Sequence, residues 1–290
     1  MKFACYADRD QQRVGVVSDD QRSIAPLRLS DADAARGVLP LVEALSRGEA
    51  LPPAEDAPVP LASVRLLAPF PRPRRNLFCV GRNYHAHASE LKGSVFNDDG
   101  KPVDQWPIVF TKVPECVIGP GDTVKLPGAG ITEQIDYEAE LTVVIGTGGK
   151  NIRREDAMRH IAGYTIVNDV TARDVQMRHS QWDLGKSFDT FCPMGPWMVT
   201  ADVFDGRRTR VRCWVNDELR QDGATELMIF DIPTLIETVS RGITLYPGDL
   251  IATGTPAGVG MGLNPPRWLQ PGDRVRIEID DLGTLENPIA

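Results

Sequence analysis

Residues 135–146, with the sequence IDYEAELTVVIG, predict a β-strand with acidic and apolar side chains on opposite faces. Side chains alternate along a strand, so Asp136, Glu138 and Glu140 share one face, with neighbours about 7 Å apart at Cα. Repulsion among them would raise one pKa unless a cation lay between them. Mg²⁺ or Mn²⁺, as hard ions that prefer oxygen ligands, are the natural occupants. The alternative is a solvated strand face without an ion, as antiparallel sheets commonly present to water.

A further carboxylate follows the next predicted strand, residues 164–168, at Asp169. A carboxylate at the end of one strand can complete an ion site beside a neighbouring strand. Asp169 or Thr171 can equally cap the helical turn that begins there. Considered locally, the sequence leaves both interpretations open.

Residues 81–91, GRNYHAHASEL, carry two of the four histidines. In a helix His87 and Glu90 lie one turn apart, so the carboxylate can hold the imidazole tautomer and raise its basicity. This predicts a general base with its orienting partner; the alternative is an exposed pair of no function. No role is assigned to His85. Lys186 and Thr255 lie in glycine-bearing loops, where they either approach an anion or are ordinary loop residues.

Composition excludes several classes of partner. The 290 residues include 32 Lys+Arg and 40 Asp+Glu, and a net charge of −8 argues against binding to nucleic acid or anionic membranes. No apolar stretch approaches the roughly 20 residues of a membrane span, and the N-terminus soon turns polar, so we expect a cytoplasmic protein. Five scattered cysteines without a CxxC pair indicate reduced thiols, which leaves oxygen ligands for any metal.

Prolines between residues 51 and 73 predict a boundary between two domains. Residues 1–70 form a small α/β domain and residues 71–290 a larger one, mainly β with some α, which makes the fold class α+β. Strands are expected at 77–80, 108–112, 139–145, 164–168, 211–215, 250–253 and 274–279. Helices are expected at 84–91, 155–161 and 232–240, the last capped by Asp231 and ended by Gly242. No dinucleotide-binding or P-loop motif is present.

Taken together, six ordered motifs resemble the fumarylacetoacetate hydrolase family, specifically its single-fold bacterial and mitochondrial branch. They span residues 77–288 and are VGRNY (80–84) with His87 and Glu90, DYEAEL (136–141), ND (168–169) with TARDVQ (171–176), GKSFD (185–189), GPW (195–197) and TGTPAGVG (253–260). The resemblance implies a catalytic domain with a mixed β-roll, a small variable N-terminal domain and a homodimer.

The resemblance also implies roles for individual residues. Mg²⁺ or Mn²⁺, one ion per subunit, would be bound by Glu138, Glu140 and Asp169. His87 and Glu90 would form a dyad on a lid over the substrate, and Lys186 would approach the oxo or enolate oxygen. The positions expected to contact substrate are Arg82, Tyr84, Arg173, Gln176 and Thr255.

These roles imply a hydrolase that depends on a divalent metal and cleaves a C–C bond in acylpyruvates, such as fumarylpyruvate, during breakdown of aromatic compounds. The alternatives are an oxaloacetate-type decarboxylase, or an isomerase or decarboxylase of 2-oxo-heptenedioate-type diacids. All three reactions place negative charge beside a carbonyl, as an enolate. A catalytically silent protein that binds oxo acids would lack the dyad, which is present here. The polar loop at 93–106 differs in length among members, and we expect it to affect specificity.

Overall fold

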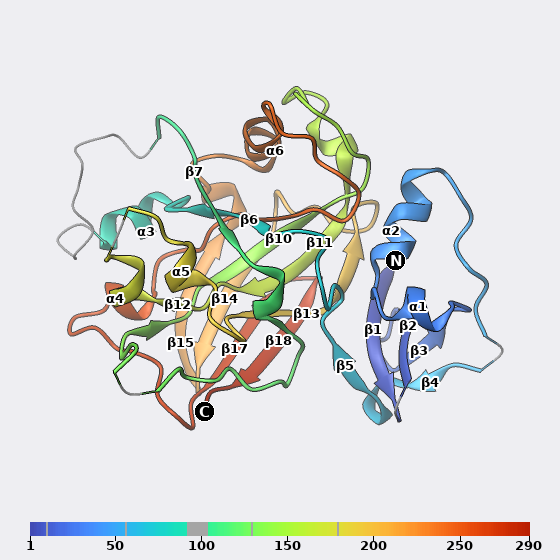
Figure 1. The fold of residues 1–290 in the computed structure, drawn as a ribbon, viewed down its shortest axis with the longest axis horizontal. Helices are drawn as coiled ribbons and strands as arrows, with labels where there is room; N and C mark the ends of the chain where they lie inside the picture. Colours follow the sequence, from blue (N-terminus) through green and yellow to red (C-terminus); the bar gives the residue numbers. More distant parts are fainter. Residues whose placement is uncertain (10, 56, 92–103, 129, 179) are drawn as a thin grey trace.

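The computed structural model describes residues 1–290 except 10, 56, 92–103, 129 and 179. The described chain is a mixed α+β fold in which strands predominate, so the predicted fold class is confirmed. Strands of the N-terminal part lie on one side of the molecule, and the short helices α3, α4 and α5 gather on the other (Figure 1). Most of the loop at 93–106 lies outside the described residues.

A twelve-stranded sheet runs through the molecule. Its strands, in spatial order, are β4 (Val59–Pro60), β3 (Ser23–Pro26), β2 (Gln11–Val17), β1 (Lys2–Asp8), β13 (Cys192–Thr200), β11 (Ile161–Asn168), β10 (Ala139–Ile145), β16 (Leu250–Ala252), β6 (Leu77–Gly81) and β7 (Ile108–Lys112). Two strands join it off this path: β5 (Arg65–Leu67), which pairs with β1, and β8 (Val117–Ile118), which pairs with β13. The centre of this sheet carries the acidic strand, which is buried along its whole length from Ala139 to Ile145.

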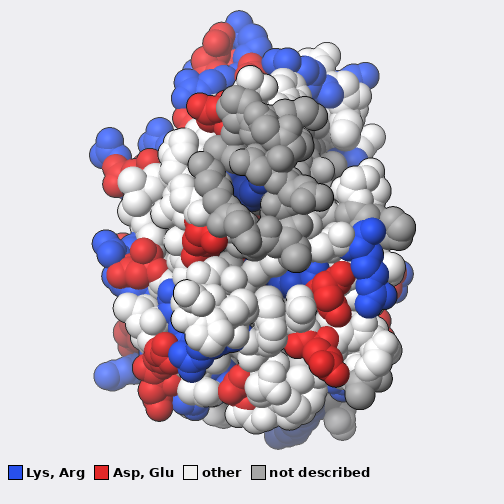
Figure 2. Space-filling model, turned by 90° about the vertical axis from the view of Figure 1, so that its left-hand side faces the viewer, with Lys and Arg blue, Asp and Glu red and all other residues white. Residues whose placement is uncertain are grey.

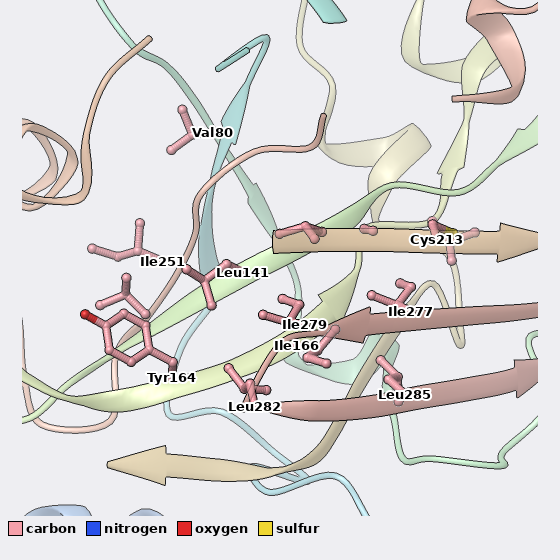
Figure 3. Packing of buried hydrophobic residues seen from close by; sticks show 14 of the residues in the cluster. Val80, Leu141, Tyr164, Ile166, Cys213, Ile251, Ile277, Ile279, Leu282 and Leu285 are labelled. Carbon is pink, nitrogen blue, oxygen red and sulfur yellow. The ribbon is translucent and has the colours of Figure 1, made fainter. Parts of the chain in front are cut away.

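A four-stranded antiparallel sheet packs against the centre of the large one. Its order is β15 (Glu218–Ala224), β14 (Arg210–Val215), β17 (Arg274–Ile279) and β18 (Gly283–Pro288). Apolar side chains from both sheets meet between them (Figure 3), among them Leu141 and Ile166 from the large sheet and Ile277 and Ile279 from the small one. This core fixes β10 and β11, and therefore the acidic side chains at their ends, in one arrangement.

The helices are short and lie outside the sheets. They are α1 (Asp31–Ala34), α2 (Leu39–Ser46), α3 (His85–Glu90), α4 (Arg173–Gln176), α5 (Asp183–Lys186) and α6 (Ile232–Ser240). The backbone N–H of Thr234 donates to Asp231 Oδ1 over 3.0 Å, so the predicted cap of α6 is confirmed. The helix expected at 155–161 is wrong: a 3₁₀ helix covers Ala157–His160, and Ile161 already pairs with Ile145 as the first residue of β11.

The N-terminal strands continue the large sheet. Antiparallel pairing between β1 and β13 places Lys2 opposite Val199 and Phe3 opposite Met198. The division into domains at residue 70 stays a prediction, but the hydrogen-bonded sheet passes from one predicted part into the other.

The surface on the side of α3, α4 and α5 mixes both charges. Figure 2 shows this side, with acidic and basic side chains interspersed over the described residues. Among the helices of the described chain, none is long and apolar enough to cross a membrane.

Candidate metal and catalytic site

Three carboxylates meet where β10 begins and β11 ends. The register pairs Ala139 with Asn168, and the backbone N–H of Asp169 donates to the carbonyl of Glu138 over 2.9 Å. One carboxylate oxygen from each of Glu138, Glu140 and Asp169 lies within 4.8 Å of the others. All three side chains are buried, with Glu138 only 5% and Glu140 only 1% exposed, so the alternative of a solvated strand face is wrong.

Two of the carboxylates are each held through one oxygen. Arg173 Nη2 lies 2.7 Å from Glu138 Oε1, and the backbone N–H of Gly254 donates to Glu140 Oε2 over 2.9 Å. Burial, Asp169 and Glu138 together raise the pKa of Glu140 well above its usual value. For Glu138, burial acts in the same direction, but Lys186 and Arg173 outweigh it and lower the pKa. The cluster therefore favours a bound cation.

Two lysines contact the third carboxylate. Lys112 Nζ lies 2.7 Å from Asp169 Oδ1, and Lys186 Nζ lies 2.7 Å from Asp169 Oδ2. Lys186 Nζ also lies 2.7 Å from Glu138 Oε2, so one ammonium group bridges two members of the cluster. Both lysines are buried. The chain thus places positive charge where the carboxylates converge, as the expected role of Lys186 near an oxyanion requires.

Asp136 does not join this cluster, although alternation along one strand predicted a shared face. The strand is interrupted, because β9 (Ile135–Asp136) pairs with β12 (Thr171–Ala172) while β10 starts only at Ala139. Asp136 Oδ2 instead accepts a hydrogen bond from Arg173 Nε over 2.9 Å, and its two oxygens accept from the backbone N–H groups of Gly260 and Met261. Asp136 therefore orients Arg173.

The predicted His–Glu pair lies on α3. His87 Nδ1 and Glu90 Oε1 are 2.7 Å apart, and His87 is only 3% exposed. Glu90 Oε2 accepts a hydrogen bond from the backbone N–H of Gly258 over 2.8 Å. The carboxylate is thus fixed on both sides and holds the imidazole through Nδ1, which leaves Nε2 for proton transfer.

His87, Lys186 and two of the three carboxylates line one narrow cavity of about 10 Å³, room for about one water molecule. Of the residues predicted as a site, it is lined by Arg82, His87, Glu138, Glu140, Arg173, Gln176, Lys186 and Thr255. Apolar side chains, Leu91, Phe110 and Trp182 among them, complete the wall. Tyr84 is the exception among the predicted substrate contacts: it lines another cavity, of about 250 Å³, together with His85.

Two polar residues that support the site had no assigned role in the sequence. Lys112 ends the apolar strand β7 and is fully buried. Gln221 Nε2 donates to Thr255 Oγ1 over 2.7 Å, and Gln221 Oε1 accepts from the backbone N–H of Ala139 over 3.0 Å. The sequence gives only a weak indication of either role. Lys112 is a lysine at the end of an apolar run, and Gln221 is a glutamine in a polar hairpin strand.

Close packing of α4 against α5 sets the position of Lys186. A Cβ added at Gly185 would lie 2.5 Å from the backbone nitrogen of Gln176 and 2.8 Å from the carbonyl oxygen of Ala172. We expect Gly185→Ala to lower the free energy of unfolding by about 1–3 kcal/mol, because backbone must shift to admit the methyl group. Urea unfolding measures this change. Leu184→Ala at the adjacent, 67% exposed position is the control, and an equal effect of both substitutions would contradict the expectation.

Residues 76–290 match the profile of the fumarylacetoacetate (FAA) hydrolase C-terminal domain. The chain belongs to the fumarylacetoacetate hydrolase family. It is 44% identical, over 309 residues covering 100% of both chains, to the oxaloacetate tautomerase YisK of Bacillus subtilis (strain 168). It is 46% identical over 234 residues to the human mitochondrial oxaloacetate tautomerase FAHD2A, covering 80% of this chain and 71% of the human one.

Solved structures agree with this assignment. The fumarylacetoacetate hydrolase EaFAH of the psychrophile Exiguobacterium antarcticum superposes with a TM-score of 0.84 and is 40% identical, covering 100% of this chain and 99% of that chain. The names of the curated relatives favour the alternative expectation, an oxaloacetate-type enzyme, over the C–C hydrolase that we placed first.

The acidic triad fits a divalent cation. It offers three buried carboxylates, the donor set that Mg²⁺ and Mn²⁺ prefer. The ammonium group of Lys186 lies between two of them, so a positive charge is already placed where a cation would bind. The crowding that raises the pKa of Glu140 is the repulsion that a bound cation offsets.

Proposed function

We propose that this protein interconverts the keto and enol forms of oxaloacetate or a closely similar 2-oxo diacid, with Mg²⁺ or Mn²⁺ at the acidic triad. The observation that carries the proposal is the common cavity: Glu138, Glu140, Lys186 and His87 line it, while Asp169 contacts Lys186 and Glu90 contacts His87. The similarity to tautomerases over the whole chain supports this choice within the family.

Glu138, Glu140 and Asp169 would hold the ion, leaving coordination positions for the substrate. Such an ion supplies Lewis-acid stabilisation of negative charge on the 2-oxo oxygen. Lys186 supplies a second positive group beside the same carboxylates, where it donates a hydrogen bond to the developing oxyanion.

His87 carries out the proton transfer. Tautomerisation breaks one C–H bond at C3 of the substrate and forms one O–H bond at the 2-oxo oxygen, so no atom is gained or lost overall. Glu90 holds Nδ1, and the lone pair on Nε2 accepts the C3 proton. The resulting imidazolium is stabilised by the adjacent Glu90 carboxylate and returns the proton to oxygen through the solvent or the substrate itself.

Cationic side chains suit a doubly negative substrate. Arg82 and Arg173 both line the cavity, and Arg173 is fixed by Asp136 and Glu138. Planar guanidinium groups bind carboxylates through two parallel hydrogen bonds, which orients the substrate as well as attracting it. The three nitrogens of Arg173 already contact Asp136, Gln176 and Glu138, so we assign the distal carboxylate of the diacid to Arg82.

Hydrolysis of acylpyruvates is the second candidate, because the same imidazole can deprotonate a water molecule that attacks a distal carbonyl. In this reaction the C–C bond breaks, pyruvate leaves as its enolate, and the free acid is the other product. The geometry of His87 and Glu90 serves both reactions. Decarboxylation of oxaloacetate would use the same charge stabilisation without attack by water. The homodimer stays a prediction.

One experiment separates these candidates. Enolic oxaloacetate is mixed with the protein and Mg²⁺, and the decay of the enol absorbance is followed with and without excess chelator. Proton NMR in parallel follows pyruvate formation from oxaloacetate, acetylpyruvate and fumarylpyruvate. We expect accelerated, chelator-sensitive loss of the enol without pyruvate. Chelator-sensitive pyruvate from an acylpyruvate would replace the proposal by hydrolysis, and pyruvate from oxaloacetate alone would replace it by decarboxylation.

A further inference from the structure

One oxygen of each carboxylate in the triad is held by Arg173, the Gly254 amide or Lys112, and the second oxygens of Glu138 and Asp169 are both contacted by Lys186. Arg173 holds Oε1 of Glu138, and the Gly254 amide holds Oε2 of Glu140. The oxygens that remain are Oε2 of Glu138, Oε1 of Glu140 and Oδ2 of Asp169. Two of these, on Glu138 and Asp169, lie 2.7 Å from one point, the Nζ atom of Lys186.

For Asp169 the holding group is Lys112, whose Nζ lies 2.7 Å from Oδ1. Lys112 also donates to the carbonyl oxygen of Val170 over 3.1 Å and to the carbonyl oxygen of Lys186. Its ammonium group thus ties the end of β11 to the end of α5. Lys112 is not among the residues that line the cavity, and it is fully buried.

We propose that Lys112 is a positioning residue that restricts Asp169 to a single ligand oxygen and so gives the metal site its preference for small octahedral ions over Ca²⁺. This inference rests on the proposed function, because it concerns the ion that the triad holds. Three carboxylates that each offer one oxygen, two of them in exchange for the contact with Lys186, suit the near-ideal octahedron of Mg²⁺ or Mn²⁺, with the remaining positions for water and substrate. Ca²⁺ takes 6–8 oxygens and readily uses both oxygens of a carboxylate, which the contact with Lys112 prevents.

The charge of Lys112 and its geometry have separable consequences. Removing one positive charge near the triad strengthens the binding of every divalent cation in similar measure. Releasing Oδ1 of Asp169 favours only the ion that uses the second oxygen. The ratio of two dissociation constants, for Ca²⁺ and for Mn²⁺, therefore isolates the positioning role, and it does not depend on catalysis.

The test measures Mn²⁺ binding by the EPR signal of free Mn²⁺ and Ca²⁺ binding by displacement of Mn²⁺, on the full-length protein. We expect the wild type to bind Mn²⁺ more tightly than Ca²⁺. Lys112→Met keeps the length of the side chain without a donor, and we expect it to lower the ratio of the Ca²⁺ to the Mn²⁺ dissociation constant by ~10-fold, the usual effect of losing a partner that orients a ligand. Lys125→Met, at an exposed position, is the matched control and keeps the wild-type ratio.

Lys112→Gln is a second variant, which keeps the inference testable if Lys112→Met does not fold. Its amide ends one atom short of the ammonium position, so it loses the contact with Asp169 but keeps a polar group for the nearby carbonyl oxygens. We expect the same decrease in ratio. An unchanged ratio in either folded variant, or a wild type that binds both ions equally, overturns the inference. Absence of Mn²⁺ binding to the wild type would instead overturn the proposed metal site itself.

Discussion

His87→Ala should slow the enol–keto conversion of oxaloacetate by roughly 10²-fold or more, the usual contribution of a positioned general base. His87 is the one imidazole among the described lining residues of the cavity, and its Nδ1 atom is already engaged by Glu90. His87 lies near enough to Glu138 to lower the pKa of that carboxyl, but among the described residues its one ion pair is with Glu90. The loss should therefore appear in kcat while Mn²⁺ binding stays at the wild-type level, measured by the enol absorbance and by equilibrium dialysis.

Two further variants test whether the effect of His87→Ala is specific to this imidazole and its partner. Glu90→Gln keeps the size of the side chain but removes the charge that stabilises the imidazolium, so it should slow the reaction less than the loss of the imidazole. His85→Ala removes the neighbouring histidine, which lines the other cavity, and should keep wild-type turnover. Full turnover in His87→Ala would remove this residue from the mechanism.

Replacing both Glu138 and Glu140 by alanine should abolish specific Mn²⁺ uptake and, with it, the chelator-sensitive part of the activity. Two of the three converging carboxylates are lost, and the remaining Asp169 is engaged by Lys112 and Lys186. A single carboxylate neutralised by two ammonium groups offers little to a divalent cation. Equilibrium dialysis against Mn²⁺ measures the uptake directly.

The matched control removes the same two charges elsewhere. Glu155 and Glu226 are exposed, and the double variant Glu155→Ala, Glu226→Ala should bind Mn²⁺ as the wild type does. Because the triad variants also remove buried charges that pair with Arg173 and Lys186, circular dichroism and thermal unfolding establish that the protein is folded. Equal Mn²⁺ uptake by the triad variant and the wild type would contradict the metal site.

Local patterns predicted the part of the site that depends on strand and helix periodicity. Alternation brought Glu138 and Glu140 to one face, and the position of Asp169 at the end of the following strand placed it beside them once β10 and β11 paired. The helical spacing of His87 and Glu90 likewise predicted their 2.7 Å contact. For Glu138 with Glu140 and for His87 with Glu90, residues close in sequence determine the geometry, so a local rule suffices, whereas the position of Asp169 depends on the pairing of β10 with β11.

Strand and helix periodicity does not predict contacts between segments that lie far apart in the sequence. Lys112 reaches Asp169 across 57 positions of sequence, and nothing in the run 108–112 shows which carboxylate it meets. The nine-residue strand β13 was not predicted, because Pro193, Gly195 and Pro196 are poor strand formers. Its burial between β1 and β11 compensates for those residues, and burial depends on the assembled sheet. The prediction that Asp136 shares a face with Glu138 and Glu140 was wrong for a similar reason. The strand is interrupted between β9 and β10, so the side chain of Asp136 meets Arg173 instead.

The pairing of β1 with β13 has a consequence for the protein in concentrated solution. The backbone of Met198 and Val199 would be an open sheet edge if Lys2 and Phe3 did not pair with it. Open, flat and apolar edges are templates on which strands of other molecules add, and β13 is buried and apolar along most of its length. The first strand of the chain therefore covers an edge to which strands of other molecules would otherwise be able to add, a task separate from the chemistry proposed for the cavity.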